Sequence, residues 1–261
     1  MRHCYVLSVF AREGAGGNPL GVVTDVTGLD GTAMQAIAAD LGFSETVFLD
    51  WTSPGVPRAR IFTPAAEIPF AGHPLVGAGW LLGAMGPGSI RRVACGIGEI
   101  PFRVEGDRVF IEVPLPRQVE PAPPAPVAGL PPAQRAWLVR LPLRYLLREM
   151  GSPEAVRLAA PDLAVLAGLP WAGTLLFHRC GAAAVARFFA PTLGVPEDPA
   201  TGSAAVALAA ALAQAGEAAS RLSIDQGDEV EAPSRIEVAW GGGVVAVGGT
   251  VRRLEVRVLE R

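Results

Sequence analysis

The feature that most constrains this chain is an internal repeat. The stretches Arg60–Leu82 and Arg187–Leu212 each predict a strand, a turn and an apolar helix that opens on glycine. Laid over each other without a gap, the two copies share Arg60/Arg187, Phe62/Phe189, Pro64/Pro191 and Pro69/Pro196, and Ile68 stands opposite Val195. The repeat indicates a duplication, so we expect two similar halves whose helices bring their N-termini to one site.

The two helices of the repeat are predicted to be buried. Neither Pro74–Leu82 nor Gly202–Ala215 carries a charge, and a helix that is apolar on all sides belongs in a core. A further helix is predicted over Thr32–Leu41 and ends at Gly42; shorter helices are predicted over Pro153–Ala160 and Leu163–Gly168, and strands over most of the rest. The pattern predicts an α+β fold with two pseudo-symmetric domains, each a mostly antiparallel or mixed β-sheet wrapped around a central buried helix.

A proline-rich stretch divides the chain. Residues 116–134 combine many prolines with few apolar residues, which is typical of a stiff, extended linker. We therefore expect an N-terminal half over residues 1–115, the linker over 116–134 and a C-terminal half over 135–261, with the last strand free to return to the N-terminal half.

Composition excludes several classes of function. The net charge of −3 gives no basic face for nucleic acid and no polybasic membrane patch, and the apolar runs are too short to span a bilayer. The N-terminal apolar run is too brief for a signal peptide, and the three cysteines are scattered without metal-site spacing, which favours a cytoplasmic protein. All 22 basic residues are arginine, which excludes lysine Schiff bases, a pyridoxal phosphate anchor and a P-loop lysine. We expect neither a cofactor nor a metal ion.

Glu45 is the first candidate for acid–base chemistry. It stands where an apolar strand begins, and its neighbours Phe43, Val47 and Phe48 would remove water from the carboxylate. Loss of hydration raises the pKa of a carboxyl group toward the range useful for proton transfer. The alternative is an exposed glutamate at the end of a strand.

Two further candidates stand at the helix starts. His73 falls in the first turn of the first central helix, where the helix dipole favours a neutral imidazole; the alternative is a capping or merely buried histidine. Asp198 precedes the second central helix, where capping is the alternative. Gly72, Gly202 and Ser203 leave backbone N–H groups for an anion such as a carboxylate. Together these residues are typical of a site that moves a proton next to a carboxylate.

Five ordered blocks of the sequence carry a family resemblance. They are GGNPLGVV, GFSETVFL, FTPAAEIPFAGHP, EDPATGSAA and QGDEVEAPSRIEV, which together run from Gly16 to Val238. The chain resembles the phenazine-biosynthesis PhzF-like isomerase family. The resemblance implies the diaminopimelate-epimerase-like fold with a site between two domains, a cofactor-free isomerase and a homodimer. The best-known member of this family isomerises trans-2,3-dihydro-3-hydroxyanthranilate.

The resemblance also implies roles for single residues. Glu45 matches the family's proton-transferring glutamate, and His73 and Asp198 match its two polar cleft residues. The substrate-holding helix starts correspond to Gly72, Gly202 and Ser203. Ser44, a predicted substrate contact, and Asn18 lie in matching blocks, where a turn or capping role explains each equally well.

The chain departs from the fold relatives that racemise amino acids with two thiols. Ala71 and Ala200 occupy the two places concerned, and none of the cysteines falls in either motif, so two-thiol racemisation is excluded. Two alternatives to an isomerase of a small carboxylate substrate remain. One is an epimerase or racemase of a small acid that uses Glu45 and Asp198 on opposite faces, and the other is a non-catalytic dimeric binding or scaffold protein of the same fold.

Overall fold

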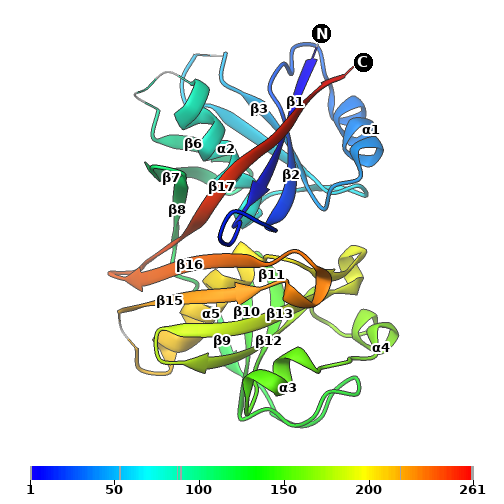
Figure 1. Ribbon diagram of the computed structural model, residues 1–261, viewed down its shortest axis with the longest axis vertical. Coiled ribbons are helices and arrows are strands. Elements are labelled where there is room, and N and C mark those ends of the chain that lie inside the picture. The colour runs from blue at the N-terminus through cyan, green and yellow to red at the C-terminus, as the bar shows by residue number, and fades with distance from the viewer. Residues whose placement is uncertain (1, 53, 87, 89, 218, 260–261) are drawn as a thin grey trace. The chain divides into compact units, whose positions relative to one another are not determined.

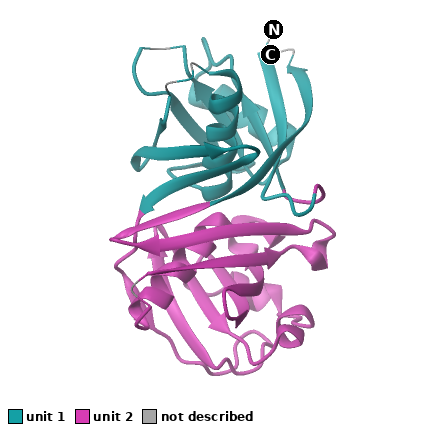
Figure 2. Ribbon diagram, turned by 60° about the vertical axis from the view of Figure 1, so that its left-hand side comes forward, with its two compact units in different colours: residues 1–13, 18–113, 248–261 teal, residues 14–17, 114–247 magenta. Residues whose placement is uncertain are grey.

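The computed structural model describes residues 2–52, 54–86, 88, 90–217 and 219–259, and the chain divides into two compact units (Figure 2). Unit 1 comprises Met1–Glu13, Asn18–Val113 and Gly248–Arg261, and unit 2 comprises Gly14–Gly17 and Pro114–Val247. The last strand therefore begins in unit 2 and continues in unit 1, as the sequence analysis allowed.

Unit 1 is a closed ring of strands around one helix (Figure 1). Its elements are β1 (Arg2–Val9), β2 (Asn18–Val23), α1 (Gly31–Leu41), β3 (Thr46–Asp50), β4 (Arg58–Phe62), β5 (Glu67–Ile68), α2 (Gly72–Met85), β6 (Arg92–Cys95), β7 (Gly98–Glu105), β8 (Arg108–Pro114) and the end of β17 (Val244–Leu259). Strand pairing runs β17–β1–β2–β3–β4–β6–β7–β8, and β8 pairs with β17 again. Pairs β2–β3 and β4–β6 are parallel, and β1–β2, β3–β4, β6–β7 and β7–β8 are antiparallel.

Helix α2 fills the centre of this ring. It contacts β1, β2, β3, β4, β6 and β7, and its residues from Gly72 to Ala78 are all buried. Gly77 allows the close approach to β1 and β2, because a Cβ atom there would lie 2.4 Å from Leu20 Cδ2 and 3.2 Å from Val9 Cγ2. The prediction of a buried central helix is confirmed, although the helix is longer than expected at both ends.

Unit 2 repeats the same architecture. Its elements are β9 (Val119–Pro121), β10 (Arg135–Leu141), β11 (Leu143–Glu149), α3 (Pro153–Arg157), α4 (Leu163–Ala167), β12 (Gly173–Cys180), β13 (Ala183–Ala190), the 3₁₀ turn η1 (Pro191–Leu193), β14 (Val195–Asp198), α5 (Gly202–Gln214), β15 (Ser220–Gln226), the 3₁₀ turn η2 (Asp228–Val230), β16 (Ser234–Gly241) and the start of β17. Helix α5 contacts β9, β10, β11 and β16, and its residues from Gly202 to Leu212 are buried.

The duplication extends to the order and direction of the strands. In unit 2, β10–β11 is antiparallel, β11–β12 parallel, β12–β13 antiparallel, β13–β15 parallel and β15–β16 antiparallel. The series β1–β2–β3–β4–β6–β7 has the same alternation in unit 1. In each unit a short strand, β5 or β14, folds back on its neighbour and leads to the central helix. The α+β prediction of two similar domains is confirmed.

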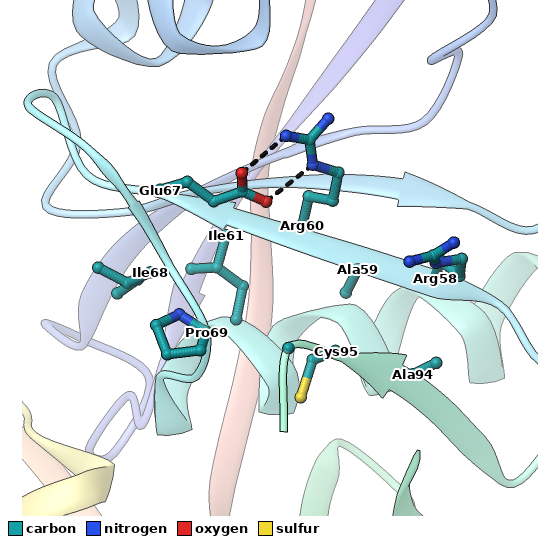
Figure 3. A pocket seen from close by; sticks show the side chains of 10 residues that line it. Arg58, Ala59, Arg60, Ile61, Glu67, Ile68, Pro69, Ala94 and Cys95 are labelled. Carbon is teal, nitrogen blue, oxygen red and sulfur yellow. Dashed lines mark hydrogen bonds and ion pairs between the residues drawn. The ribbon is translucent and has the colours of Figure 1, made fainter. Parts of the chain in front are cut away.

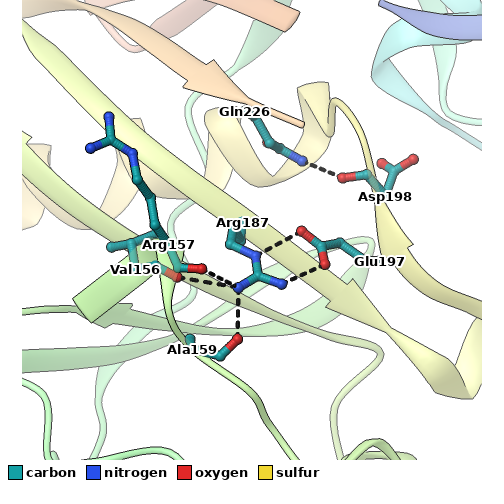
Figure 4. A network of polar contacts seen from close by, with 7 residues as sticks. All are labelled: Val156, Arg157, Ala159, Arg187, Glu197, Asp198 and Gln226. Atoms are coloured by element: carbon teal, nitrogen blue, oxygen red, sulfur yellow. Dashed lines mark hydrogen bonds and ion pairs between the residues drawn. The ribbon is translucent and has the colours of Figure 1, made fainter. Parts of the chain in front are cut away.

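The residues shared by the two copies make the same contacts. Arg60 Nε and Nη2 donate to the carboxylate of Glu67 at 2.8 and 2.7 Å (Figure 3), and Arg187 does so to Glu197 at the same two distances (Figure 4). Each guanidinium also lies over the phenylalanine two residues later, at 5.2 Å from the ring centroid of Phe62 and 4.9 Å from that of its counterpart Phe189. Each pair thus ties the strand before the turn to the segment that enters the central helix.

The predicted linker is wrong as a separate segment. Residues 116–134 belong to unit 2: they contain β9, which pairs with β10, and Leu130 is only 1% exposed. Arg148 fastens the stretch to the sheet, since its Nη1 and Nη2 donate to the carbonyls of Ala125 and Pro131 at 3.1 and 2.7 Å. The prolines restrict the backbone, but a buried leucine and carbonyl acceptors are enough to dock it. The boundary between the halves accordingly falls at residues 113–114.

The smaller helices follow the sequence closely. Helix α1 begins after Asp30, whose side chain accepts from the N–H of Ala33, and ends at Gly42 with φ of 69°. Helix α3 ends at Arg157, three residues before the predicted Ala160. Among the described residues, no helix is long and apolar enough to cross a membrane.

Candidate active site

Glu45 and His73 come together at the start of α2 in unit 1. Glu45 immediately precedes β3, and His73 is the second residue of α2. Oε2 of Glu45 lies 3.6 Å from Nε2 of His73, while the side chains are 19% and 4% exposed. Both residues were predicted from the sequence. The fold brings Glu45, in the turn between α1 and β3, next to the start of α2.

Asn18 and Ser44 extend this pair into a chain of polar groups. Nδ2 of Asn18 lies 3.5 Å from Nδ1 of His73, and the hydroxyl of Ser44 donates to Oδ1 of Asn18 at 3.4 Å. Asn18 is the first residue of β2 and is 1% exposed. The buried amide therefore connects the far side of the imidazole to the residue next to Glu45.

Burial raises the pKa of Glu45 above its ordinary value, and a hydrogen bond from Ser44 opposes part of that rise. Burial removes water from the carboxyl group. The ionised form depends on this hydration more than the neutral form does, so burial favours the protonated form and raises the pKa. An upward shift of the pKa moves the carboxyl group toward the range in which a side chain can both take and return a proton, as proton transfer requires.

Asp198 lies at the start of α5 in unit 2, where Thr201 and Gln226 fix it. Oδ2 of Asp198 accepts from the hydroxyl of Thr201 at 2.5 Å, and Asp198 is 9% exposed. Nε2 of Gln226 donates to the Asp198 carbonyl at 2.7 Å (Figure 4) and to the Thr201 hydroxyl at 3.2 Å. Thr201, not Asp198, is the N-cap residue of α5, so Asp198 stands three residues before the cap position.

Ser203 and Tyr145 form a second polar contact at the same helix start. Oγ of Ser203 and Oη of Tyr145 lie 3.2 Å apart, and either atom can donate. Ser203 is the second residue of α5, the position that His73 occupies in α2. The duplication therefore places a serine hydroxyl in unit 2 where unit 1 has an imidazole.

The starts of the two central helices differ from those of the other helices. The side chains of Asp30, Ser152 and Asp162 accept hydrogen bonds from first-turn N–H groups of α1, α3 and α4. The N-cap residues of α2 and α5, Ala71 and Thr201, make no such bond, and neither first turn contains an acidic residue. The backbone donors at Gly72, Gly202 and Ser203 are therefore not occupied by a side-chain cap, which suits an anion.

The sequence identified the ionisable groups but not their partners. Tyr145 comes from β11, far along the chain from Ser203, and no local pattern pointed to it. Gln226 comes from β15 and opens the quoted block QGDEVEAPSRIEV, but it was not singled out. Thr201 stood within a quoted motif and was not singled out. Among the described residues, no group of three histidine, cysteine, aspartate or glutamate side chains could hold a metal ion.

Comparison with known proteins decides the family. Residues 7–127 and 144–256 match the family described as phenazine biosynthesis-like protein. The chain belongs to this family. It is 32% identical over 248 residues to the trans-2,3-dihydro-3-hydroxyanthranilate isomerase of Pseudomonas aeruginosa, an alignment that covers 90% of this chain and 89% of the relative.

Solved structures agree with this assignment. A predicted epimerase of Pseudomonas aeruginosa is 33% identical, covers 100% of both chains and has a TM-score of 0.80. A hydroxyproline epimerase of Agrobacterium vitis, crystallised with trans-4-hydroxy-L-proline, covers 98% of this chain and 90% of its own, with a TM-score of 0.66 at 12% identity, and so shows the fold alone. The phenazine biosynthesis-like chain described here is an enzyme of the isomerase class with the epimerase-like fold.

Proposed function

We propose that this enzyme is a cofactor-independent isomerase that moves a carbon-bound proton within a small carboxylate substrate similar to trans-2,3-dihydro-3-hydroxyanthranilate. The observation that carries the proposal is Glu45: its burial raises its pKa, and its carboxylate faces His73 at the start of a helix without a side-chain cap. The named activity of the relative at 32% identity supports the substrate class.

Glu45 acts as base and then as acid. Its carboxylate takes the proton from a C–H bond next to an unsaturated or carboxylate-bearing carbon, and the bonding electron pair spreads into that system. The O–H bond formed on Glu45 then breaks as the proton returns to a different carbon of the same molecule. Proton and electrons balance without any oxidant, reductant or cofactor.

His73 supplies a hydrogen bond to the charge that develops. In the proposed arrangement, Nδ2 of Asn18 donates to Nδ1 of His73, so Nε2 carries the ring proton and faces the Glu45 side of the imidazole. Ser44 donates to Glu45 when the carboxylate is ionised and to Asn18 when Glu45 is protonated, since one hydroxyl has one proton. The hydrogen bond of Ser44 can therefore switch partner as the protonation state of Glu45 changes.

We extend the proposal to the start of α5. Asp198 would orient a polar group of the substrate, and the N–H groups of Gly202 and Ser203, like that of Gly72, would hold carboxylate oxygens. If Asp198 and Glu45 serve one substrate, the rate losses of Glu45→Gln and Asp198→Asn will not add in the double variant.

The test is isomerisation in D₂O, followed by NMR on trans-2,3-dihydro-3-hydroxyanthranilate and a panel of small cyclic and acyclic acids. The proposal predicts deuterium at a new carbon together with a moved double bond. Deuterium at the original carbon with inverted configuration would instead establish the epimerase reading, which the predicted epimerase among the structural relatives favours. No exchange on any acid, together with no thermal stabilisation by any of them, would identify a non-catalytic binding or scaffold protein.

We also propose a homodimer in the cytoplasm. The family resemblance supports the dimer, and the three cysteines, none of them in a disulfide, are consistent with a reducing compartment. Light scattering of the purified protein tests the first statement, since a monomer mass at micromolar concentration would contradict it. Fractionation of the native cells tests the second.

A further inference from the structure

One face of the unit 2 sheet gathers more arginines than carboxylates. Arg117, Arg140 and Arg144 line a cavity of about 480 Å³, here called the arginine pocket, whose other lining residues include Leu138 and Glu120. Glu120 Oε2 lies 3.2 Å from Arg144 Nη2; among the described residues, neither of the other two arginines forms an ion pair. Three guanidinium groups thus face a single carboxylate in a protein whose net charge is −3.

The strand register makes this arrangement costly. Arg140 and Arg144 are direct partners in the antiparallel pair β10–β11. Like charges directly opposite each other destabilise a sheet, and an anion held by both guanidinium groups removes that cost. The pattern therefore favours a ligand with negative charge.

An apolar cavity adjoins the arginine pocket. This second cavity, of about 290 Å³ and here called the apolar slot, is lined by Leu138, which it shares with the arginine pocket, and by Leu146, Trp171 and most of the proline-rich residues 122–127. Leu138 and Leu146 pair across β10–β11 two residues from the paired Arg140 and Arg144, so the two cavities are successive rows on one sheet face. Tyr145, between Arg144 and Leu146, bonds to Ser203, and this places the start of α5 on the opposite face.

A buried charge lies at the far end of the same face. Arg148 lines the apolar slot, is 1% exposed and bonds to two backbone carbonyls, and no described carboxylate partners it. Its Nε has no hydrogen-bond partner. Carbonyl oxygens satisfy N–H groups but do not neutralise a guanidinium, and an unneutralised charge in a low-dielectric setting attracts an anion over several ångströms.

We propose that this face binds a small amphipathic organic anion, with a ring or short apolar body in the slot beside Trp171 and a carboxylate or phosphate group between Arg140 and Arg144. The apolar slot gives the site its preference for an organic body, and the arginine pocket gives it the requirement for charge. The proposal does not depend on the proposed isomerase chemistry, because none of these residues belongs to the Glu45 or Asp198 groups.

The test is calorimetric titration at low ionic strength with benzyl phosphate, benzoate, benzyl alcohol and inorganic phosphate. Benzyl phosphate and benzoate should bind saturably. Inorganic phosphate, which lacks the ring, and benzyl alcohol, which lacks the charge, should bind more weakly. Arg140→Gln/Arg144→Gln should weaken benzyl phosphate by about tenfold or more, since each charged hydrogen bond contributes on that scale. Arg221→Gln, a change at an exposed arginine of β15, is the matched control and should leave binding unchanged.

Three outcomes would overturn the proposal. Equal affinity for inorganic phosphate and benzyl phosphate would show that the apolar slot takes no part in binding. Equal weakening in Arg221→Gln would show general charge attraction. A double arginine variant that changes the mass of the protein in light scattering, without changing benzyl phosphate binding, would assign the face to a second copy of the chain.

Discussion

Replacing Ser44 by alanine tests how the environment of Glu45 sets its proton affinity. Ser44 donates a hydrogen bond that lowers the pKa of Glu45 against the larger upward effect of burial. A hydrogen bond to a charged group is worth about 1.5–3 kcal/mol, and about 1.4 kcal/mol corresponds to one pKa unit. Because the Glu45 side chain is 19% exposed, water replaces part of the lost bond, and we expect the pKa of Glu45 to rise by less than the full energy of that hydrogen bond would give.

The assay has two readouts. The pH dependence of kcat/KM reports the free enzyme, where an ionised base gives activity that rises with pH through the pKa of Glu45; Ser44→Ala should move that limb to higher pH. Carbon-13 NMR of the Glu45 carboxyl, assigned with Glu45→Gln, follows the same titration without substrate. Ser223→Ala is the control, since Ser223 donates to Glu237 at 2.9 Å elsewhere in the chain.

The same shift affects stability with a definite sign. Because the pKa of Glu45 is raised in the folded state from its ordinary value of 4.5, the folded protein binds the proton more tightly than the unfolded chain. The resulting stabilisation is complete below that ordinary value and is lost as pH rises through the folded pKa. Ser44→Ala should extend this loss to higher pH. A carboxyl titration that stays in place or moves downward would refute the reasoning.

Three other predictions concern the repeat, the imidazole and the helix starts. Arg187→Gln should lower the free energy of unfolding by about 3–5 kcal/mol in urea titrations, against less than about 1 kcal/mol for Arg60→Gln. The reason is that the side chain of Arg187 is 11% exposed and that of Arg60 is 37% exposed, and equal losses would contradict it. With only three histidines in the chain, nitrogen-15 NMR should find the ring proton of His73 on Nε2, and Asn18→Leu should abolish that preference; a proton on Nδ1 in the unmodified protein would reject the proposed arrangement. Small carboxylates at about 100 times Kd should stabilise the fold by roughly 2.7 kcal/mol in thermal unfolding, and no response to any carboxylate or to sulfate would count against anion binding at α2 and α5.

The repeat was visible in the sequence because its physical cause is local. Arg60 and Phe62 lie two residues apart on one strand, and their counterparts Arg187 and Phe189 do the same, so each guanidinium packs on its own phenylalanine. The glutamate that completes each pair falls within ten residues. Short-range contacts of this kind leave a readable trace, and the predicted fold class followed from them.

The partners of the candidate residues left no such trace. Asn18 reaches His73 across 55 positions of sequence, and Gln226 reaches Asp198 across 28. Strand pairing brings these residues together, and a single sequence does not show which side chains will meet. The proline-rich stretch misled for a related reason: its composition describes the backbone alone, whereas Leu130 and the acceptors of Arg148 decide where it docks.

The most direct measurement of the account is deuterium incorporation from D₂O by the unmodified enzyme and by Glu45→Gln on the same accepted acid. The amide keeps the size of the side chain and can still hydrogen-bond, but it cannot take a proton from carbon. The account predicts a loss of exchange at or beyond the upper end of about 10²–10⁴-fold, with substrate binding and thermal stability retained. Equal exchange by the two proteins would contradict it and would move the base to another residue.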